Sequence, residues 1–214
     1  MSAVEEPIEI LRLTNERFGS CCYIVASSPG ARRAVVVDPG VPYETIRTVL
    51  RRRKLAVDFV ILTHEHFDHM SGAGELCAGE GAKLVASKEC AESVTDPARN
   101  MSKYSGLGEV ALRSVDVVIA GDRGDLAWEG LALEMFRTPG HTPGSMCLRI
   151  GPALFTGDAL IKDIKTVTRL PGGDKRLSRR SIRWLLDTFP GRTKVYPGHG
   201  EPFELREASR WAEL

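Results

Sequence analysis

The sequence contains no long apolar run and few cysteines. No stretch of about 18 apolar residues occurs in it, so we expect no transmembrane helix. Met1 to Pro7 carries two glutamates and lacks the basic-then-apolar order of a signal peptide. Five cysteines are an odd number, and their spacings follow no disulfide framework. These absences predict a soluble protein of the reducing cytoplasm.

Net charge is also low, because 29 Lys and Arg stand against 28 Asp and Glu, which leaves +1. This balance gives no reason to expect a nucleic acid or a membrane as a partner. One stretch is basic: residues 162–194 hold ten Lys or Arg and three Asp. Four of its arginines recur at helical spacing, and we interpret them as the solvent-exposed face of a helix and not as an RNA clamp. These are Arg176, Arg179, Arg180 and Arg183.

Apolar periodicity divides the chain into short strands and amphipathic helices. Ile8–Leu13 alternates, and Cys22–Ala26 and Ala34–Val37 flank a Ser-Ser-Pro-Gly turn, which predicts a strand followed by a hairpin. Further strands are predicted at 57–62, 83–86, 115–120, 131–137, 146–150, 153–155 and 193–196. Helices are predicted at 43–54, from residue 70 to about 78, and at 88–95, 178–189 and 207–214. Two β-rich halves with helices outside predict an α/β protein that packs as an αβ/βα sandwich in one domain.

The strongest signal for chemistry is His64-Glu65-His66-Phe67-Asp68-His69, directly after the predicted strand 57–62. Zinc binds histidine nitrogen and carboxylate oxygen, and four such groups here concentrate ligands at the end of a strand. His64 and His66 can point one way, while Asp68 and His69 turn toward a neighbouring point. One loop can therefore serve two metal ions, neither of which it coordinates fully.

The remaining ligands have few candidates, because the chain has only five histidines. His141 lies in Thr-Pro-Gly-His-Thr-Pro-Gly, and His199 lies in Tyr-Pro-Gly-His-Gly. Asp158, in Thr-Gly-Asp, follows the predicted strand 153–155. A single histidine in such a loop is more often a turn residue than a ligand. Beside the cluster at 64–69, however, all three residues become candidate ligands on loops that a rigid scaffold positions.

The ordered set of candidate ligands resembles the seven-ligand signature of the metallo-β-lactamase fold superfamily. Its members here are His64, His66, Asp68, His69, His141, Asp158 and His199. Nearly the whole chain takes part, since residues 37–40, 62–64, 138–142, 156–158 and 197–200 match the superfamily's motifs in order. The resemblance implies a four-layer αβ/βα sandwich with two metal ions at one edge, zinc or alternatively iron or manganese. It places His64, His66 and His141 on one ion, Asp68, His69 and His199 on the other, and Asp158 between them.

Such a site implies hydrolysis, because two dications lower the pKa of a shared water and polarise a carbonyl or phosphoryl oxygen. Asp68 is a candidate catalytic residue that orients the nucleophile besides binding metal. Asp38, in an Asp-Pro-Gly turn, is a candidate acceptor for the second ring nitrogen of a histidine ligand, with a simple turn role as the alternative. Three basic residues that follow Asp158 are candidates for contact with an anionic substrate. They are Lys162, Lys165 and Arg169.

Within the superfamily the chain is most similar to short glyoxalase II-like (hydroxyacylglutathione hydrolase-like) enzymes, which share Thr156-Gly157-Asp158 followed by Leu-Pro-Gly-Gly at 170–173. This similarity implies a thioester or related ester as substrate, either a small molecule or an acyl group on a carrier. Asp158 and the lack of a secretion signal argue against a β-lactamase. The sequence leaves the oligomeric state open.

Three alternatives stay open. A lactonase of the same fold is one, although Ile161 stands where such lactonases often place a tyrosine. An iron persulfide dioxygenase is another, and it would use only His64, His141 and Asp158 as a two-histidine, one-carboxylate triad. The third is a metal-binding protein that has lost turnover.

Cys21 and Cys22 are adjacent on a predicted strand, so their side chains point to opposite faces of a sheet. We therefore interpret them as core residues and not as a redox pair. The same interpretation applies to Cys77, Cys90 and Cys147.

Overall fold

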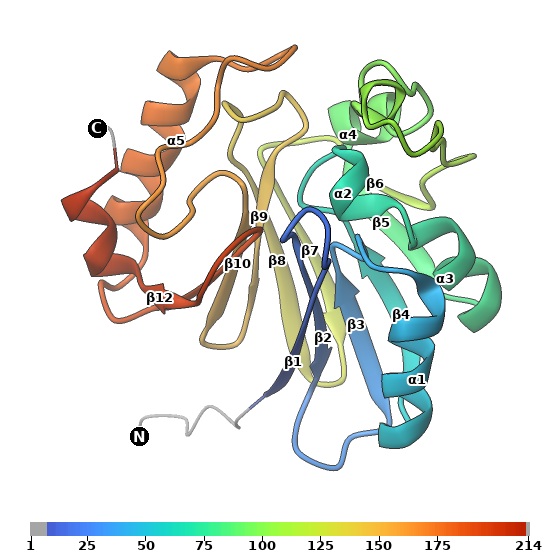
Figure 1. Cartoon of the computed structure of the whole chain (residues 1–214). Coiled ribbons are helices and arrows are strands. Elements are labelled where there is room, and N and C mark those ends of the chain that lie inside the picture. The colour runs from blue at the N-terminus through green and yellow to red at the C-terminus, as the bar shows by residue number, and fades with distance from the viewer. Residues whose placement is uncertain (1–7, 213–214) are drawn as a thin grey trace, which may run out of the picture.

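Two six-stranded sheets face each other in the computed structural model, which describes residues 8–212 (Figure 1). The first sheet is antiparallel from β1 to β3 and parallel from β3 to β6. Its strands, in spatial order, are β1 (Glu9–Thr14), β2 (Cys21–Ala26), β3 (Arg33–Val37), β4 (Ala56–Ile61), β5 (Lys83–Ser87) and β6 (Val117–Ile119).

The second sheet is antiparallel except where β10 and β11 run parallel. Its strands, in spatial order, are β12 (Phe203–Glu204), β11 (Lys194–Pro197), β10 (Ala153–Gly157), β9 (Met146–Ile150), β8 (Leu131–Arg137) and β7 (Arg123–Trp128). Each sheet therefore joins an antiparallel part to a parallel part, and the chain completes the first sheet before it begins the second.

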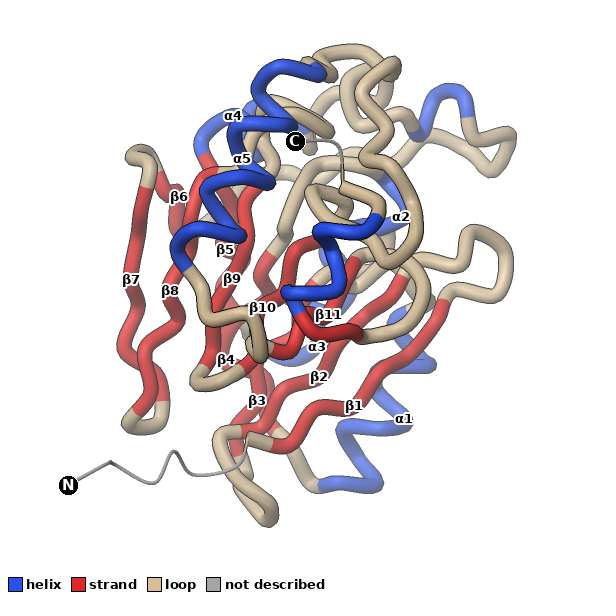
Figure 2. Tube along the Cα trace, turned by 90° about the vertical axis from the view of Figure 1, so that its left-hand side faces the viewer, coloured by secondary structure: helices blue, strands red, loops and turns tan. Residues whose placement is uncertain are grey.

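Helices cover the outer faces of both sheets. On the first sheet lie α1 (Tyr43–Arg53) and α3 (Ala73–Glu80), and on the second lie α5 (Lys175–Thr188) and the 3-10 helix η2 (Leu205–Arg210) (Figure 1). Figure 2 views the molecule from the α5 side, with α5 in front of the second sheet. The shorter helices are α2 (Phe67–Met70), α4 (Lys88–Ser93) and η1 (Ser102–Tyr104). The predicted αβ/βα sandwich of four layers is confirmed.

Three apolar layers hold the four structural layers together. Strand β2 shows how the sequence builds two of them, because its alternate side chains enter different layers. Cys22 and Ile24 pack under α1 and α3, whereas Cys21 and Tyr23 pack between the two sheets. A third layer, including Leu185 of α5, lies between the second sheet and its helices. The cysteines are therefore core residues on opposite faces, as predicted, and all five thiols of the chain are free.

Several predicted elements differ from the structure in extent. The helix expected after the histidine cluster, to about residue 78, is α3, which ends at Glu80; it is separated from α2 where Gly72 packs against the carbonyl of Val41. Strand β7 was missed because its sequence, Arg-Gly-Asp-Leu-Ala-Trp, carries charged and small residues. Helix α5 begins three residues before the predicted start, since the Asp174 side chain accepts hydrogen bonds from the backbone N–H groups of Arg176 and Leu177.

The predicted helix 207–214 was wrong in type and extent, because η2 is a 3-10 helix that ends at Arg210. Residues 213 and 214, and the Met1 to Pro7 segment that lacks a signal-peptide pattern, lie outside the described residues. Within residues 8–212, no helix is both long and apolar enough to cross a membrane.

Candidate metal centre

The seven candidate ligands converge from both sheets, because each follows the end of a strand. The cluster at residues 64–69 follows β4, and Asp68 and His69 lie in the first turn of α2. From the second sheet, His141 follows β8, Asp158 follows β10 and His199 follows β11. Carboxyl ends of parallel strands meet at one edge of a sheet, so the packing of the two sheets brings these loops together.

The ligand atoms form two trios. Atoms of His64, His66 and His141 lie within 4.8 Å of one another, and so do atoms of Asp68, His69 and His199. In the first trio, Nδ1 of His66 is 3.0 Å from Nε2 of His141. In the second, Nε2 of His69 is 3.2 Å from Nε2 of His199. Each trio thus combines residues from the end of β4 with a histidine from the second sheet.

Asp158 lies between the trios. Its Oδ2 is 3.5 Å from Nε2 of His141 and 3.6 Å from Nε2 of His199, while its Oδ1 is 3.6 Å from Nε2 of His69. One carboxylate thus faces histidines of both groups. Gly198 makes this approach feasible, because a Cβ at that position would overlap Oδ1 of Asp158 and the ring of His69.

Asp38, directly after β3, supports the site from behind. Its Oδ1 accepts a hydrogen bond from the backbone N–H of Thr63 (2.7 Å), and its Oδ2 accepts one from the Thr63 hydroxyl (2.6 Å). The same Oδ2 lies 3.2 Å from Nδ1 of His69. Asp38 has a φ of 49° and is 2% exposed. It therefore combines a turn conformation with a contact to a candidate ligand, the two roles that the sequence left as alternatives.

Other contacts hold the first trio. The Thr63 hydroxyl lies 3.1 Å from Nδ1 of His64, and the carbonyl oxygen of Val167 lies 2.8 Å from Nδ1 of His141. Glu65 stands between His64 and His66 in the sequence, and its side chain is buried. It accepts a hydrogen bond from the Thr142 hydroxyl at 2.9 Å. Our sequence reading missed these three supports. The position of Glu65 in the cluster was a usable signal, whereas a backbone carbonyl such as that of Val167 leaves none.

Burial and neighbouring charges shift the pKa values of the histidines in opposite directions. Burial lowers the pKa of His64 well below its usual value, lowers that of His66 to about 3, and lowers that of His141. Burial also acts to lower the pKa of His69, but the carboxylates of Asp68, Asp158 and Asp38 outweigh it and raise this pKa to about 10. The pKa of Asp68 is lowered, since His69 and His199 outweigh the effect of burial.

The donor set fits a transition metal. Buried polar atoms normally have hydrogen-bond partners, yet Nε2 of His64, Nε2 of His66 and Oδ1 of Asp158 are buried without one. Imidazole nitrogens from different loops also face each other, an arrangement that a cation between them would satisfy. Five imidazoles and two carboxylates suit zinc, iron or manganese. The described residues therefore offer a coordinating group for such an ion in each trio.

The three basic candidates for substrate contact separate in the structure. Lys162 lies 3.7 Å from the carboxylate of Glu207 in η2. Lys165 and Arg169 instead line a cavity beside α5. The cavity also receives Lys175 and Arg179 of α5. Arg176, Arg179, Arg180 and Arg183 are exposed, as predicted for a solvated helix face.

Comparison with known proteins adds a family match. The family model of the metallo-beta-lactamase superfamily matches residues 15–199. An uncharacterised protein of Mycobacterium tuberculosis is 33% identical over 193 residues, which cover 84% of this chain and 85% of that protein. A probable polyketide biosynthesis zinc-dependent hydrolase, BaeB of Bacillus velezensis, is 25% identical over 189 residues, with coverage of 88% and 76%.

Two further similarities concern a named enzyme and a solved structure. A hydroxyacylglutathione hydrolase of Polaromonas sp. is 29% identical over 189 residues, which cover 87% of this chain and 64% of that protein. The crystal structure of BLEG-1, a B3 metallo-beta-lactamase, has a TM-score of 0.85 and 26% identity, with coverage of 93% and 95%.

Proposed function

The chain belongs to the metallo-beta-lactamase superfamily, and from this premise we propose that it is a dinuclear zinc hydrolase of a thioester or related ester. The observation that carries the proposal is the position of Asp158, whose carboxylate faces histidines of both trios at 3.5 to 3.6 Å. A mononuclear site formed by His64, His141 and Asp158 would give His69 and His199 no role as ligands.

Each trio would hold one zinc ion, and the Asp158 carboxylate would contact both. When bound, the two ions supply a water of lowered pKa and polarise the carbonyl oxygen of the substrate. Asp68, whose carboxylate faces both His69 and His199 at 3.5 to 3.6 Å, would orient the attacking water. Asp38 would hold His69 in one tautomer and ring orientation, because its carboxylate accepts the Nδ1 proton.

The names of two relatives support the choice of metal and substrate. BaeB is named a probable zinc-dependent hydrolase, and the Polaromonas protein is named a hydroxyacylglutathione hydrolase. We extend zinc and a thioester substrate to this chain on that basis. The acyl group would be part of a small molecule or be bound to a carrier, with no nucleic-acid or membrane partner. We also propose a cytoplasmic location, which the five free cysteines support.

Metal analysis together with a substrate panel tests this function. Protein produced without added metal would be analysed for zinc, iron and manganese, and the zinc-loaded enzyme would be assayed with thioesters, lactones and phosphodiesters. We expect about two zinc ions per chain and the highest kcat/KM with a thioester. If the protein instead contains one iron ion per chain and consumes oxygen with a persulfide, it is a dioxygenase and not a hydrolase. If it prefers a lactone, the proposed thioester substrate is wrong.

A further inference from the structure

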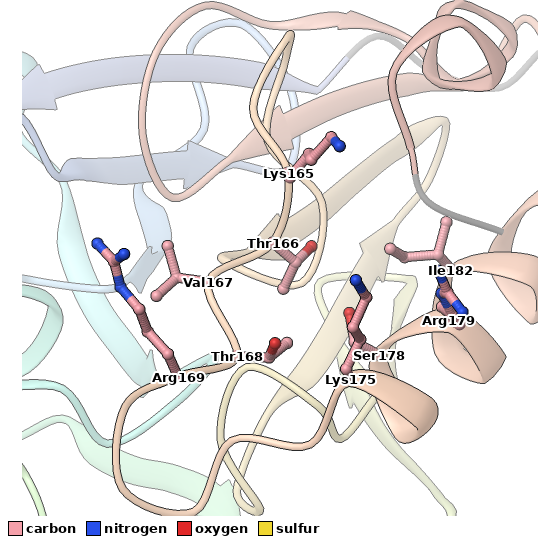
Figure 3. Close-up of a pocket in the computed structure, with 9 residues that line it drawn as sticks. All are labelled: Lys165, Thr166, Val167, Thr168, Arg169, Lys175, Ser178, Arg179 and Ile182. Atoms are coloured by element: carbon pink, nitrogen blue, oxygen red, sulfur yellow. The ribbon is translucent and has the colours of Figure 1, made fainter.

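A cationic cavity of about 360 Å³ lies beside the candidate metal centre, between the loop that follows Asp158 and the first half of α5 (Figure 3). Residues 165–169 form one wall, and Lys175, Ser178, Arg179 and Ile182 form the other. Among the residues that the structure describes, nine line the cavity; four of these are Lys or Arg and none is Asp or Glu, so this part of the lining carries a formal charge of +4.

Three of the cations gather around the same space. Figure 3 shows Lys165 reaching in from the loop and Lys175 and Arg179 from α5, whereas the Arg169 side chain runs the opposite way, beyond Val167. Lys165, Lys175 and Arg179 each interact with another group of the chain, so an incoming anion would compete with these contacts. A multiply charged anion would compete for these cations more strongly than a single carboxylate does.

Both walls of the cavity are attached to the loop that carries His141. On the loop side, the Val167 carbonyl faces Nδ1 of His141 at 2.8 Å. On the helix side, the Ser181 hydroxyl donates to the carbonyl of Pro139 (2.8 Å), and the backbone N–H of Asp174 donates to the carbonyl of Gly140 (2.9 Å). An anion in the cavity would therefore be held on the His141 side of the centre.

We propose that this cavity binds the phosphate of a phosphorylated pantetheine thiol, the leaving group of the thioester. The assignment rests on the proposed thioester hydrolysis. The diphosphate next to the pantetheine of coenzyme A places two negative charges side by side, which suits clustered Lys and Arg side chains, whereas the carboxylates of a peptide thiol are singly charged and spread apart. The phosphodiester of a carrier-bound pantetheine carries one charge. The flexible arm of pantetheine separates thiol from phosphate, so the two ends of this leaving group can occupy separate sites.

Paired variants of α5 test the assignment. In Lys175→Gln/Arg179→Gln, two cavity cations become neutral. In the matched control, Arg176→Gln/Arg180→Gln, the same helix loses the same charge at exposed positions outside the cavity lining. Each zinc-loaded protein would be assayed with acyl-coenzyme A, acyl-phosphopantetheine on a carrier protein, and unphosphorylated acyl-pantetheine. Binding of adenosine 3′,5′-bisphosphate would be measured separately by calorimetry.

We expect the cavity variant to lower kcat/KM for the phosphorylated thioesters at least ~10-fold more than for acyl-pantetheine, mainly through KM. It should weaken bisphosphate binding at least ~10-fold, while the control variant stays near wild type. If the cavity variant loses more kcat/KM with acyl-coenzyme A than with the carrier-bound thioester, the cavity binds the phosphate of coenzyme A. If it loses more with the carrier-bound thioester, the cavity binds the phosphate of the carrier's pantetheine arm.

Equal losses in the two double variants, or equal losses with and without the phosphate, would overturn the assignment. The calorimetry separates it from the proposed function. Cavity-dependent bisphosphate binding without hydrolysis of any thioester would refute thioester hydrolysis but leave the anion site. Thioester hydrolysis that does not depend on Lys175 and Arg179 would refute the anion site alone.

Discussion

The carboxylate of Asp38 lies 3.2 Å from Nδ1 of His69, on the side of the ring opposite to the nitrogen that faces His199. Asp38 also accepts two hydrogen bonds from Thr63, so one buried side chain fixes both the start of the histidine loop and the orientation of His69. Asp38 thereby helps to set how His69 is presented as a ligand, and its own carboxylate lies within 4.8 Å of ligand atoms of His64 and His69.

Asp38→Asn should therefore weaken zinc binding by ~10–100-fold, because the amide is a poorer acceptor for the Nδ1 proton of His69. The dissociation constant would be measured by competition with a chromophoric chelator. Asp116→Asn is the control, since Asp116 also accepts a backbone hydrogen bond, from Leu84, but lies outside the candidate metal groups. Equal weakening in both variants would indicate a general loss of stability and not a positioning role.

Asp158→Ala should reduce hydrolysis by orders of magnitude and weaken metal retention, while the fold survives. The reason is the place of Asp158 between the trios, where it would contact both ions. Metal content after dialysis, turnover and the circular dichroism spectrum would be measured on the same preparation. Two tightly held ions with near-normal turnover would show that this carboxylate does not bridge.

His199→Ala should lower the metal content from about two toward one ion per chain and reduce hydrolysis at least ~100-fold, the scale expected for the loss of an electrostatic stabiliser. A dioxygenase would respond differently, because its single iron needs only His64, His141 and Asp158. Iron-loaded His199→Ala that still consumes oxygen with a persulfide would favour that alternative over hydrolysis.

The metal-free protein should show an alkaline loss of stability that depends on His69. Its pKa of about 10 in the folded protein exceeds the usual value of an unfolded histidine, about 6.5, so its protonated form stabilises the fold. This contribution is complete below about pH 6.5 and is lost as the pH rises toward 10. The difference in unfolding free energy between wild type and His69→Gln should shrink over that range in urea titrations of metal-free protein.

His66→Gln provides the contrast, because the pKa of His66 is lowered to about 3. Above about pH 7.5 this histidine is largely neutral in both the folded and the unfolded protein, so its difference from wild type should stay nearly constant up to about pH 10. A difference that shrinks equally for both variants would contradict the assigned charge of His69.

Replacing Cys21 and Cys22 with Ser should lower stability more than activity. Both side chains are 1% exposed, and Cys21 Sγ has the Gly200 carbonyl as its partner at 3.6 Å. At Cys22, burying a hydroxyl without a hydrogen bond would cost about 1–3 kcal/mol. Urea unfolding and turnover would be compared for the double variant, with the metal content matched to wild type. Loss of turnover in a stably folded, fully metallated variant would give the thiols a chemical role.

The candidate ligand set could be gathered from the sequence because the histidines are few and each lies in a segment that follows a predicted strand. Periodicity also located β8 and β9 correctly, since Leu131–Arg137 and Met146–Ile150 alternate or run apolar between turn residues. Strand β7 escaped this reasoning. It lies at the edge of the second sheet, next to β8 only, and its outward positions carry charged side chains.

The supports of the site were harder to predict because they depend on tertiary contacts. The Val167 carbonyl meets His141 across 26 positions of sequence, and no side-chain type marks a carbonyl oxygen. Arg179 shares helical spacing with Arg176, Arg180 and Arg183, so the pattern predicted one solvent-exposed face, in which Lys175 was not included. Only the fold of the loop after Asp158 separates the two cavity cations from their neighbours.

Each trio takes ligands from both sheets, and this arrangement makes a bound ion a cross-link. His66 and His141 are 75 positions apart in the chain, and His69 and His199 are 130 apart. Closing such long loops removes much conformational freedom from the unfolded chain. Each bound ion would therefore stabilise the folded state by linking the first half of the protein to the second. Removal of metal should then weaken the packing between the two sheets before it disrupts the hydrogen bonding within either sheet. Limited proteolysis of the metal-free protein should therefore cut first in the segment that joins β6 to β7.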